Sequence, residues 1–414
     1  MQKAVAFWGG ALALGLSLSA WAGPTPQGAA VKISSCTTCI QQVPAVAGSS
    51  SGGFLTVWKG ASAADPNGVS GRFFTSTGNP RGSDFLANKD LVGDQYDPAV
   101  AADAQGNFIV VWAEVVNGNS EIKGRRYQAN GTPLGASFKV NQDQAGTPTL
   151  PADFNPTVAA LKDGFIVAWM SLLPAGNGFP GTTPQVLGRK LSTTGAPLGN
   201  QVKISTGLVN GDRPDVCVDS SGKPVVVWTS VDGFPLFEAN HQGVSLRRLT
   251  PAGAPVDPAE TVVALPKANS VHPAVSCGSG STFVVVWHSD QPPATERTDI
   301  LAQRFTRLGR PAGPPFRVNT TVTKEDRNPS VAYDPKGSFV VVWQAYLDGV
   351  KVSILGRRFA ASGAALSPEF EVFAGADNAL VPSNPDIAPI GTAGNFVIVW
   401  QNGSQSISGR RFTP

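Results

Sequence analysis

The sequence predicts an all-β protein, a seven-bladed β-propeller with four-stranded blades. Three observations predict it: a sevenfold repeat, a strand in every repeat that is apolar on both faces, and chain ends that complement each other. Charged residues make up only 15% of the chain, which holds 46 Gly and 34 Pro. Few charges with many turn-forming residues are typical of many short strands.

A tryptophan marks every repeat, at intervals of roughly 54 to 59 residues, which is a period typical of propellers. Each tryptophan ends an apolar run such as FVVVW, so we interpret all seven as structural. A proline lies upstream, and an Arg-containing strand such as GRRF follows, then a Gly turn and a last strand. The tryptophans are Trp58, Trp112, Trp169, Trp228, Trp287, Trp343 and Trp400.

The repeat that begins at Pro329 shows the expected strands. Proline fits the first residue of a strand because its missing N–H is not needed there. In the second strand, 339–343, alternate residues point to opposite faces, and both sets are apolar. A sheet covered on both sides fits blades stacked face to face around an axis, whereas a two-sheet sandwich leaves one face polar. The third and fourth strands are expected at 354–359 and 370–372.

The two ends of the chain complete one repeat. The last copy stops at Pro414 without a fourth strand, while 26–34 (PQGAAVKIS) matches the fourth strand of the third copy, 197–205 (PLGNQVKIS). We therefore expect the N-terminal strand to complete the last blade and close the ring, which removes exposed sheet edges. This predicts one domain over 23–414, with blades at about 44–88, 98–141, 156–205, 214–264, 273–319, 329–373, and 385–414 plus 26–34.

Residues 1–22 have the pattern of a secretory signal peptide: a basic start, an apolar core, and Ala20 and Ala22 before the cut. We expect an exported protein, periplasmic or extracellular at the cell surface, with no membrane segment after cleavage. The net charge of +3 gives no electrostatic footprint for nucleic acid. An even number of cysteines in an exported chain predicts two disulfides. Cys36 and Cys39 favour a small loop-closing bond, whereas the pairing of Cys217 with Cys277, in adjacent blades, depends on geometry.

The chain resembles a class of secreted bacterial propeller proteins whose repeats read roughly Pro-x-Val-Ala, Gly-x-Phe-Val-Val-Val-Trp, Gly-Arg-Arg-Phe and Gly-x-Pro-x-Gly-x-x-Phe-x-Val-Asn. The resemblance covers 26–414 and implies a propeller without implying an activity. More loosely, the first hairpin is similar to those of TolB-like and sialidase propellers. The sialidase pattern Ser-x-Asp-x-Gly is not met, since the turns read Asp103-Ala-Gln-Gly106 and Asp334-Pro-Lys-Gly337. The resemblance therefore implies no sialidase active site.

Function is expected on the face that carries the variable loops, because binding residues concentrate on loops held by a rigid scaffold. The residues before the strand-one prolines should ring the channel mouth on this face, either as a ligand pocket or as water-binding caps. They are Val43, Asp97, Asn155, Arg213, His272, Asn328 and Asn384. Long insertions at 171–185 and 229–244 form a second candidate set with Phe179, Phe234, Phe237, Glu238 and His241, or else are merely solvated loops.

Two other patterns have weaker interpretations. His272, His288 and Asp290 share one hairpin and are candidate ligands of a divalent ion. The chain has only three histidines and no His-x-x-x-His spacing, so we expect no metal site. We expect no cofactor, although calcium stays an option. The recurrent arginines suggest an anionic groove, but stacking on aromatic rings or pairing with Asp explains them better. They are Arg72, Arg125, Arg126, Arg189, Arg247, Arg248, Arg304, Arg357, Arg358, Arg410 and Arg411.

No catalytic motif such as Gly-x-Ser-x-Gly or His-Glu-x-x-His is present. The first expectation is therefore a non-enzymatic binding propeller that engages a glycan or a protein. One alternative is a structural component of a cell-envelope assembly. The other is a carbohydrate-active enzyme, a glycosidase or lyase, because such propellers use carboxylates near the channel mouth. The carboxylates expected on that face are Asp94, Asp97, Asp212, Asp290, Glu325 and Asp326.

Overall fold

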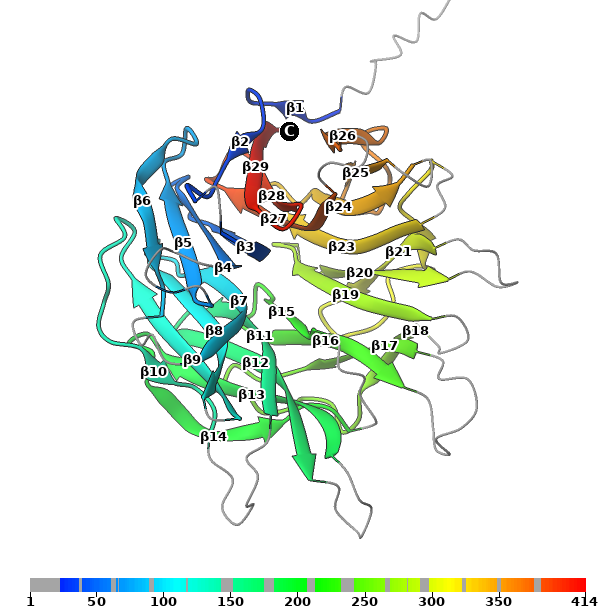
Figure 1. Ribbon diagram of the computed structural model, residues 1–414. Helices are drawn as coiled ribbons and strands as arrows, with labels where there is room; N and C mark the ends of the chain where they lie inside the picture. The colour runs from blue at the N-terminus through cyan, green and yellow to red at the C-terminus, as the bar shows by residue number, and fades with distance from the viewer. Residues whose placement is uncertain are drawn as a thin grey trace, which may run out of the picture.

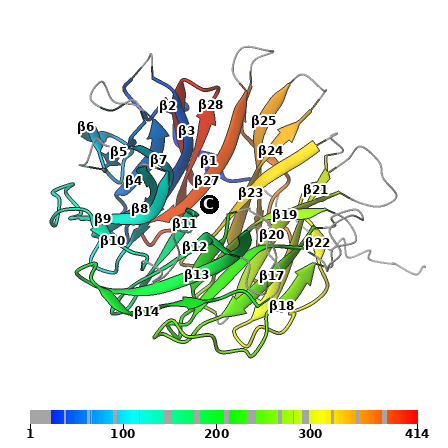
Figure 2. The ribbon, with the colours of Figure 1, turned by 60° about the horizontal axis from the view of Figure 1, so that its bottom comes forward.

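The protein is a β-propeller of four-stranded blades, which the computed structural model shows radiating from a central axis (Figures 1 and 2). Among the described residues, none forms a helix long and apolar enough to cross a membrane. The predicted signal peptide, 1–22, lies outside the described residues. The described residues are 23–36, 39–60, 65, 67–88, 93–116, 118–142, 152–174, 182–206, 213–231, 242–264, 269–280, 282–290, 298–321, 325–347, 351–375 and 381–414.

Three neighbouring blades follow chain order, each with its first strand innermost, and all their strand pairs are antiparallel. The first has β3 (Gln41–Gly48), β4 (Phe54–Gly60), β5 (Val69–Phe74) and β6 (Pro80–Leu86). The second has β7 (Asp94–Ala102), β8 (Phe108–Val116), β9 (Asn119–Tyr127) and β10 (Phe138–Lys139). The third has β11 (Ala152–Leu161), β12 (Gly164–Pro174), β13 (Thr182–Ser192) and β14 (Pro197–Lys203).

The remaining strands form a fourth blade, an eight-stranded sheet and a five-stranded sheet. The fourth blade has β15 (Asp215–Val218), β16 (Pro224–Val231), β17 (Gln242–Arg248) and β18 (Thr261–Ala264). The eight-stranded sheet has β19 (Ser270–Cys277), β20 (Thr282–Asp290), β21 (Thr298–Thr306), β22 (Phe316–Arg317), β23 (Glu325–Tyr333), β24 (Phe339–Tyr346), β25 (Val352–Phe359) and β26 (Phe370–Ala374). The five-stranded sheet has β27 (Pro382–Ile390), β28 (Asn395–Asn402) and β29 (Ser406–Thr413) with β1 (Thr25–Pro26) and β2 (Val31–Lys32).

This arrangement differs from the expected seven separate blades. The hydrogen bonds divide the described strands into five separate blades and one eight-stranded sheet. The physical reason is a parallel contact between β21 and β23, in which Thr298 pairs with Glu325 and joins two sets of strands. Inner strands contact one another in the succession β3, β7, β11, β15, β19, β23 and β27, and β27 contacts β3.

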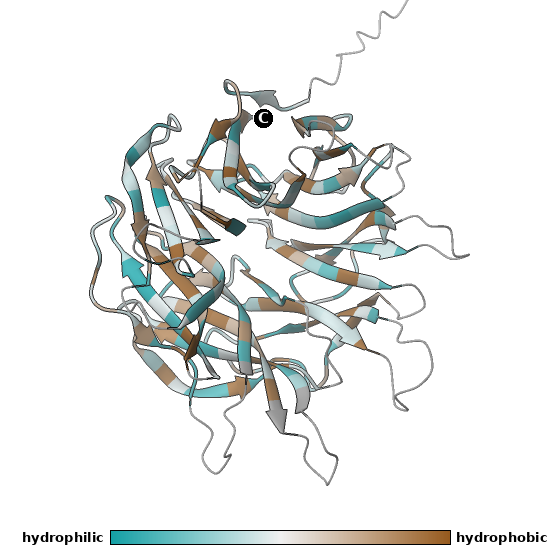
Figure 3. Ribbon diagram, in the orientation of Figure 1, coloured by the Kyte–Doolittle hydropathy of each residue, from teal (hydrophilic) through white to brown (hydrophobic). Residues whose placement is uncertain are grey.

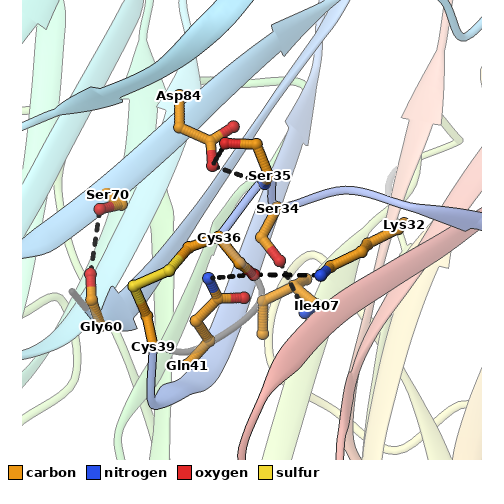
Figure 4. Close-up of a disulfide and its surroundings, with 10 residues drawn as sticks. All are labelled: Lys32, Ser34, Ser35, Cys36, Cys39, Gln41, Gly60, Ser70, Asp84 and Ile407. Carbon is orange, nitrogen blue, oxygen red and sulfur yellow. Dashed lines mark hydrogen bonds between the residues drawn. A yellow bond between two sulfur atoms is a disulfide. The ribbon is translucent and has the colours of Figure 1, made fainter. Parts of the chain in front are cut away.

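The two ends of the described chain lie in the same sheet. β1 pairs with β29 through Thr25 and Thr413, and β2 pairs with it through Val31 and Gly409. Ile33 follows β2 and is fully buried. Figure 4 shows the segment that continues toward β3: the Ser34 hydroxyl accepts from the Ile407 N–H at 3.2 Å, and the Cys36–Cys39 disulfide follows. The two predicted disulfides are confirmed, the second joining Cys217 to Cys277 across adjacent blades.

The core consists of apolar layers between neighbouring sheets, and Figure 3 shows hydrophobic stretches within strands on all sides of the molecule. Every repeat tryptophan is buried, with at most 2% of its surface exposed. Trp112 packs with Leu55 and Val57 of the preceding blade, and Trp169 packs with Val111 in the same way. Each such ring buries roughly 150–250 Å², so these wedges contribute several kcal/mol apiece before entropy.

The recurrent arginines link blades through main-chain carbonyls. The Arg125 guanidinium donates to Gly135 O in its own blade and to Ala87 O in the preceding blade. Arg247 donates to Asp257 O and to Ile204 O in the same pattern. The expected aromatic stacking and Asp pairing are present as well. Guanidinium groups lie 5.4–5.9 Å from ring centres in four blades, while Arg248 pairs with Asp257 at 2.6 Å and Arg358 with Asp334 at 3.0 Å. The carbonyl acceptors are the addition that the sequence did not predict. Further examples of the carbonyl pattern are Arg72, Arg189, Arg357 and Arg410.

Candidate functional site

Most of the residues that precede the proline in the first strand of a repeat have an unusual backbone conformation. Six of these residues have φ between +48° and +52°, in the left-handed region that non-glycine residues rarely adopt. The strand pairing shifts register at the same six places, for example between Tyr96 and Ala99, so these six X-Pro pairs form bulges, whereas Arg213-Pro214 precedes its strand and forms none. Bulges of this kind re-aim side chains, here toward the axis of the propeller. The six residues are Val43, Asp97, Asn155, His272, Asn328 and Asn384.

These bulges surround a cavity on the propeller axis with a volume of about 550 Å³. A volume of this size is within the range of ligand pockets, about 300–1,000 Å³. The structure therefore brings together the predicted ring, because all its members line this cavity: Val43, Asp97, Asn155, Arg213, His272, Asn328 and Asn384. The predicted loop residues Phe179, Phe234, Phe237, Glu238 and His241 lie outside the described residues, as does Asp212.

One side of the mouth is charged. Arg213 Nη2 donates to Asp97 Oδ1 at 3.2 Å, although the two residues come from non-adjacent blades. The Asp97 side chain stays 22% exposed, so it faces the cavity despite this partner. The Lys59 ammonium lies 3.8 Å from the centre of the Tyr96 ring, and the Tyr96 hydroxyl donates to Asp94 at 2.9 Å.

Burial shapes the protonation of this charged side. Burial lowers the pKa of Lys59, and the negative charges of Asp97 and Asp94 oppose that shift. Burial raises the pKa of Tyr96, and its hydrogen bond to Asp94 adds to the shift. Tyr96 is therefore a neutral donor near neutral pH. Asp97 thus lies within the electrostatic range of two cationic side chains, Arg213 and Lys59.

The other side of the mouth is a chain of neutral polar groups. Asn328 Nδ2 donates to Gln344 Oε1 at 3.2 Å and to Asn384 Oδ1 at 3.5 Å. Asn384 Nδ2 donates to Gln401 Oε1 at 3.3 Å, and that oxygen also accepts the Val43 N–H at 3.2 Å. We call these four side chains, Asn328, Gln344, Asn384 and Gln401, the amide arc. They present amide donors and acceptors without a net charge.

Two imidazoles extend the amide arc. The His272 and His288 rings stack with centroids 4.9 Å apart, and His288 Nδ1 accepts the Asn328 N–H at 3.4 Å. Burial lowers the pKa of His288 to about 3, with further contributions from His272 and Arg327, so His288 is neutral at neutral pH. Asp290, which shares the hairpin with these two histidines, accepts from Asn269 and Thr298. Within the described chain, no three His, Cys, Asp or Glu side chains are placed to hold a metal ion.

Two carboxylates lie deeper in the cavity wall. Asp215 accepts the N–H groups of Val216 and Val275, each at 2.8 Å. Asp386 accepts the Val46 N–H at 2.8 Å and the Ser330 hydroxyl at 2.9 Å. Burial raises the pKa of both, that of Asp215 to about 6. Because each carboxylate ties one inner strand to the next, we interpret both as parts of the wall.

The other predicted carboxylates have local partners. Asp326 is buried and accepts from the amide of Asn319, so it anchors its strand to the preceding blade. Glu325 pairs with Arg327 at 3.2 Å. Sequence reasoning missed Lys59, Gln344 and Gln401, which line up in one structural position. The signal was available, because each directly follows a repeat tryptophan, at the end of the second strand where it meets the channel mouth.

Comparisons with known proteins show the fold. No family model matches the chain, and no curated protein matches it. A protein of unknown function from Dyadobacter fermentans is similar at TM-score 0.54 and 11% identity, covering 93% of this chain and 97% of that one. A Penicillium chrysogenum α-L-arabinanase complexed with arabinobiose has TM-score 0.52 and 11% identity, covering 95% and 99%. A Hadza microbial sialidase has TM-score 0.52 and 11% identity, covering 85% and 74%.

These similarities contradict the first functional expectation. The sequence favours a non-enzymatic binding propeller, whereas the arabinanase and the sialidase to which this structure is similar are glycosidases. Sequence motifs are a weak guide in this fold, because residues that meet at the axis come from separate blades, as Asp97 and Arg213 do. The alternative of a carbohydrate-active enzyme agrees better with these findings. At this level of identity the comparisons show the β-propeller fold alone.

Proposed function

We propose that the protein is a carbohydrate-active enzyme that cleaves glycosidic bonds at the mouth of its central cavity. One observation carries the proposal: Asp97 lies at the cavity rim, partly exposed, with its carboxylate held by Arg213. The glycosidase neighbours of the same fold support it. Glycoside cleavage commonly depends on carboxylates that flank the scissile bond, and the cavity is large enough to enclose sugar residues.

Asp97 is the carboxylate that we assign to the reacting centre. Arg213 Nη2 donates to the Asp97 carboxylate at 3.2 Å, which holds it in place for a role as nucleophile or general base. Its left-handed backbone, with φ of 49°, is a conformation that Asp tolerates better than most residues. Such backbone outliers cluster at active sites, where the surrounding structure keeps them in place. Asp94 is the nearest second carboxylate along the same strand, and it is oriented by the Tyr96 hydroxyl.

Replacing Asp97 tests the proposal directly. Asp97→Asn keeps the shape and tolerates the same backbone but removes the charge, so we expect kcat to fall by about 100-fold or more on the best glycan substrate. Asp163→Asn is the matched control, because Asp163 is an exposed carboxylate in a hairpin turn, paired with Lys190. Release of reducing sugar from arabinan, sialyl-oligosaccharides and other polysaccharides measures the activity. Failure of the wild-type protein to release sugar from any of them would contradict the proposal.

We also propose that the protein acts outside the cytoplasm as a single seven-bladed domain. The disulfides support an oxidising, exported environment. The seven-blade count treats the eight-stranded sheet as two blades that touch at Thr298 and Glu325. The pairing of β1 and β2 with β29 supports closure of the ring by the N-terminal segment.

A further inference from the structure

Carboxylates outnumber cations in the lining of the cavity. Its described lining contains three carboxylates, those of Asp97, Asp215 and Asp386, and one guanidinium, that of Arg213. Arg213 is paired with Asp97 and also lies within electrostatic range of Asp386. A ligand carboxylate entering this space would therefore meet an excess of like charge, which is costly where water is scarce.

The cationic side chains near the mouth also have carboxylates beside them. Lys59 lies over the Tyr96 ring, within range of Asp97 and Asp94. Arg327 pairs with Glu325 at 3.2 Å. Binding an acidic sugar through either cation would require that cation to leave its present carboxylate partner. Replacing a protein carboxylate by the carboxylate of the sugar contributes little net free energy to the binding of an acidic sugar.

The amide arc suits the opposite chemistry. A primary amide has an oxygen that accepts and an NH₂ group that donates, which matches the hydroxyl groups of a neutral sugar. Asn328 and Asn384 line the cavity themselves, while Gln344 and Gln401 hold them from behind at 3.2 and 3.3 Å. Val43 lies beside Gln401 and adds an apolar surface for the C–H face of a sugar ring.

We infer that the channel mouth takes a neutral sugar residue, with its hydroxyl groups on Asn328 and Asn384, and discriminates against uronic and sialic acids. The inference rests on the proposed function and narrows its substrate class. It separates two activities found among proteins of this fold, because an arabinan is neutral whereas a sialoside carries a carboxylate.

The test measures equilibrium binding by calorimetry, which needs no turnover. The probes are matched oligosaccharide pairs that differ only by CH₂OH or carboxylate, glucose against glucuronate and galactose against galacturonate, together with arabino- and sialyl-oligosaccharides. We expect the best neutral probe to bind at least about 10-fold more tightly than any acidic probe. Acidic binding equal to neutral binding, or no binding of either class, would overturn the inference.

Two variants locate the site. Asn384→Gly removes one amide and suits the positive φ of 48°, so it should weaken neutral binding by roughly 3- to 10-fold without loss of folding. Asn79→Gly, in an exposed turn, is the control and should bind as wild type. Asp97→Asn frees Arg213, so its affinity for acidic probes should rise; an unchanged or lower affinity would count against the charge argument.

The binding and cleavage measurements test the neutral-sugar inference and the proposed enzymatic function separately. Neutral sugars that bind without being cleaved would leave this inference standing and sink the proposed enzymatic function. Cleavage of sialosides or uronides at rates equal to neutral glycosides would keep the enzyme and overturn the neutral-sugar preference.

Discussion

At the residue scale, the candidate site depends on a backbone conformation repeated at the start of the inner strands. Asp and Asn tolerate positive φ because their short side chains can bond locally, which accounts for Asp97, Asn155, Asn328 and Asn384. Val43 is the exception, since a β-branched residue at φ of 51° is strained. Such strain persists only where neighbouring contacts fix the backbone, here the bond from the Val43 N–H to Gln401.

Val43→Asn should stabilise the protein. Asn occupies the equivalent place in other blades with the same φ, so the change should relieve about 1 kcal/mol of backbone strain. The free energy of unfolding in urea measures it. Val381→Asn, at an exposed position outside the bulges, is the control and should have almost no effect. A loss of stability in Val43→Asn would show that the valine packs more favourably than its backbone suggests.

Much of the ring around the cavity could be predicted because each member has a fixed place before a proline. The pairing across the ring could not. Asp97 and Arg213 lie 116 residues apart in non-adjacent blades, and no spacing rule relates them. Lys59 and Gln401 were missed for a different reason. Their fixed place after a repeat tryptophan is a signal in the sequence, but the residue type at this place varies between repeats, so a search for shared chemistry overlooks it.

At the element scale, the third strand of most repeats carries an arginine that ties blades together. The sequence predicts the position of this arginine but not its partners, because a main-chain carbonyl has no sequence signature. Arg247 donates to Ile204 O at 2.7 Å and to Asp257 O. In β21 Gln303 takes the place of this arginine and donates to Gly313 O at 3.5 Å, a longer bond than that of Arg247 to Ile204 O. A fork of donors is needed to reach both blades, which explains why arginine recurs.

Arg247→Lys should destabilise the protein by about 2 kcal/mol, because lysine keeps the charge but cannot bridge two carbonyls from one rigid plane. The side chain is buried, so the orphaned carbonyls would not regain water easily. Urea unfolding measures the loss. Arg310→Lys, at an exposed turn position, provides the comparison and should be neutral. Equal free energies of unfolding for the two variants would mean that the bonds from Arg247 to the two blades contribute no stability beyond that of a positive charge.

At the scale of the whole molecule, the number of strands per blade follows from the repeat, whereas the division into sheets does not. A contact at Thr298 and Glu325 merges two sets of strands, and a single residue pair of this kind is beyond sequence patterns. The sequence shows that the N-terminal segment, 26–34, is similar to a fourth strand, 197–205, which is the strand that the last repeat lacks. The pairing of β2 with β29 and the complete burial of Ile33 give this similarity a physical basis.

Ile33 therefore tests how the two chain ends hold the molecule together. It is fully buried in a cluster with Trp58, Val399 and Ile407, so it belongs to the apolar layer between the first blade and the five-stranded sheet. Ile33→Ala should lower the free energy of unfolding by about 2–5 kcal/mol, the usual cost of a buried cavity of this size. Val31→Ala is the matched control, because Val31 lies two residues away and is 49% exposed. If the N-terminal segment contributes little to stability, both variants will unfold at the same urea concentration. A much lower midpoint for Ile33→Ala will mean that the pairing of the two chain ends stabilises the propeller.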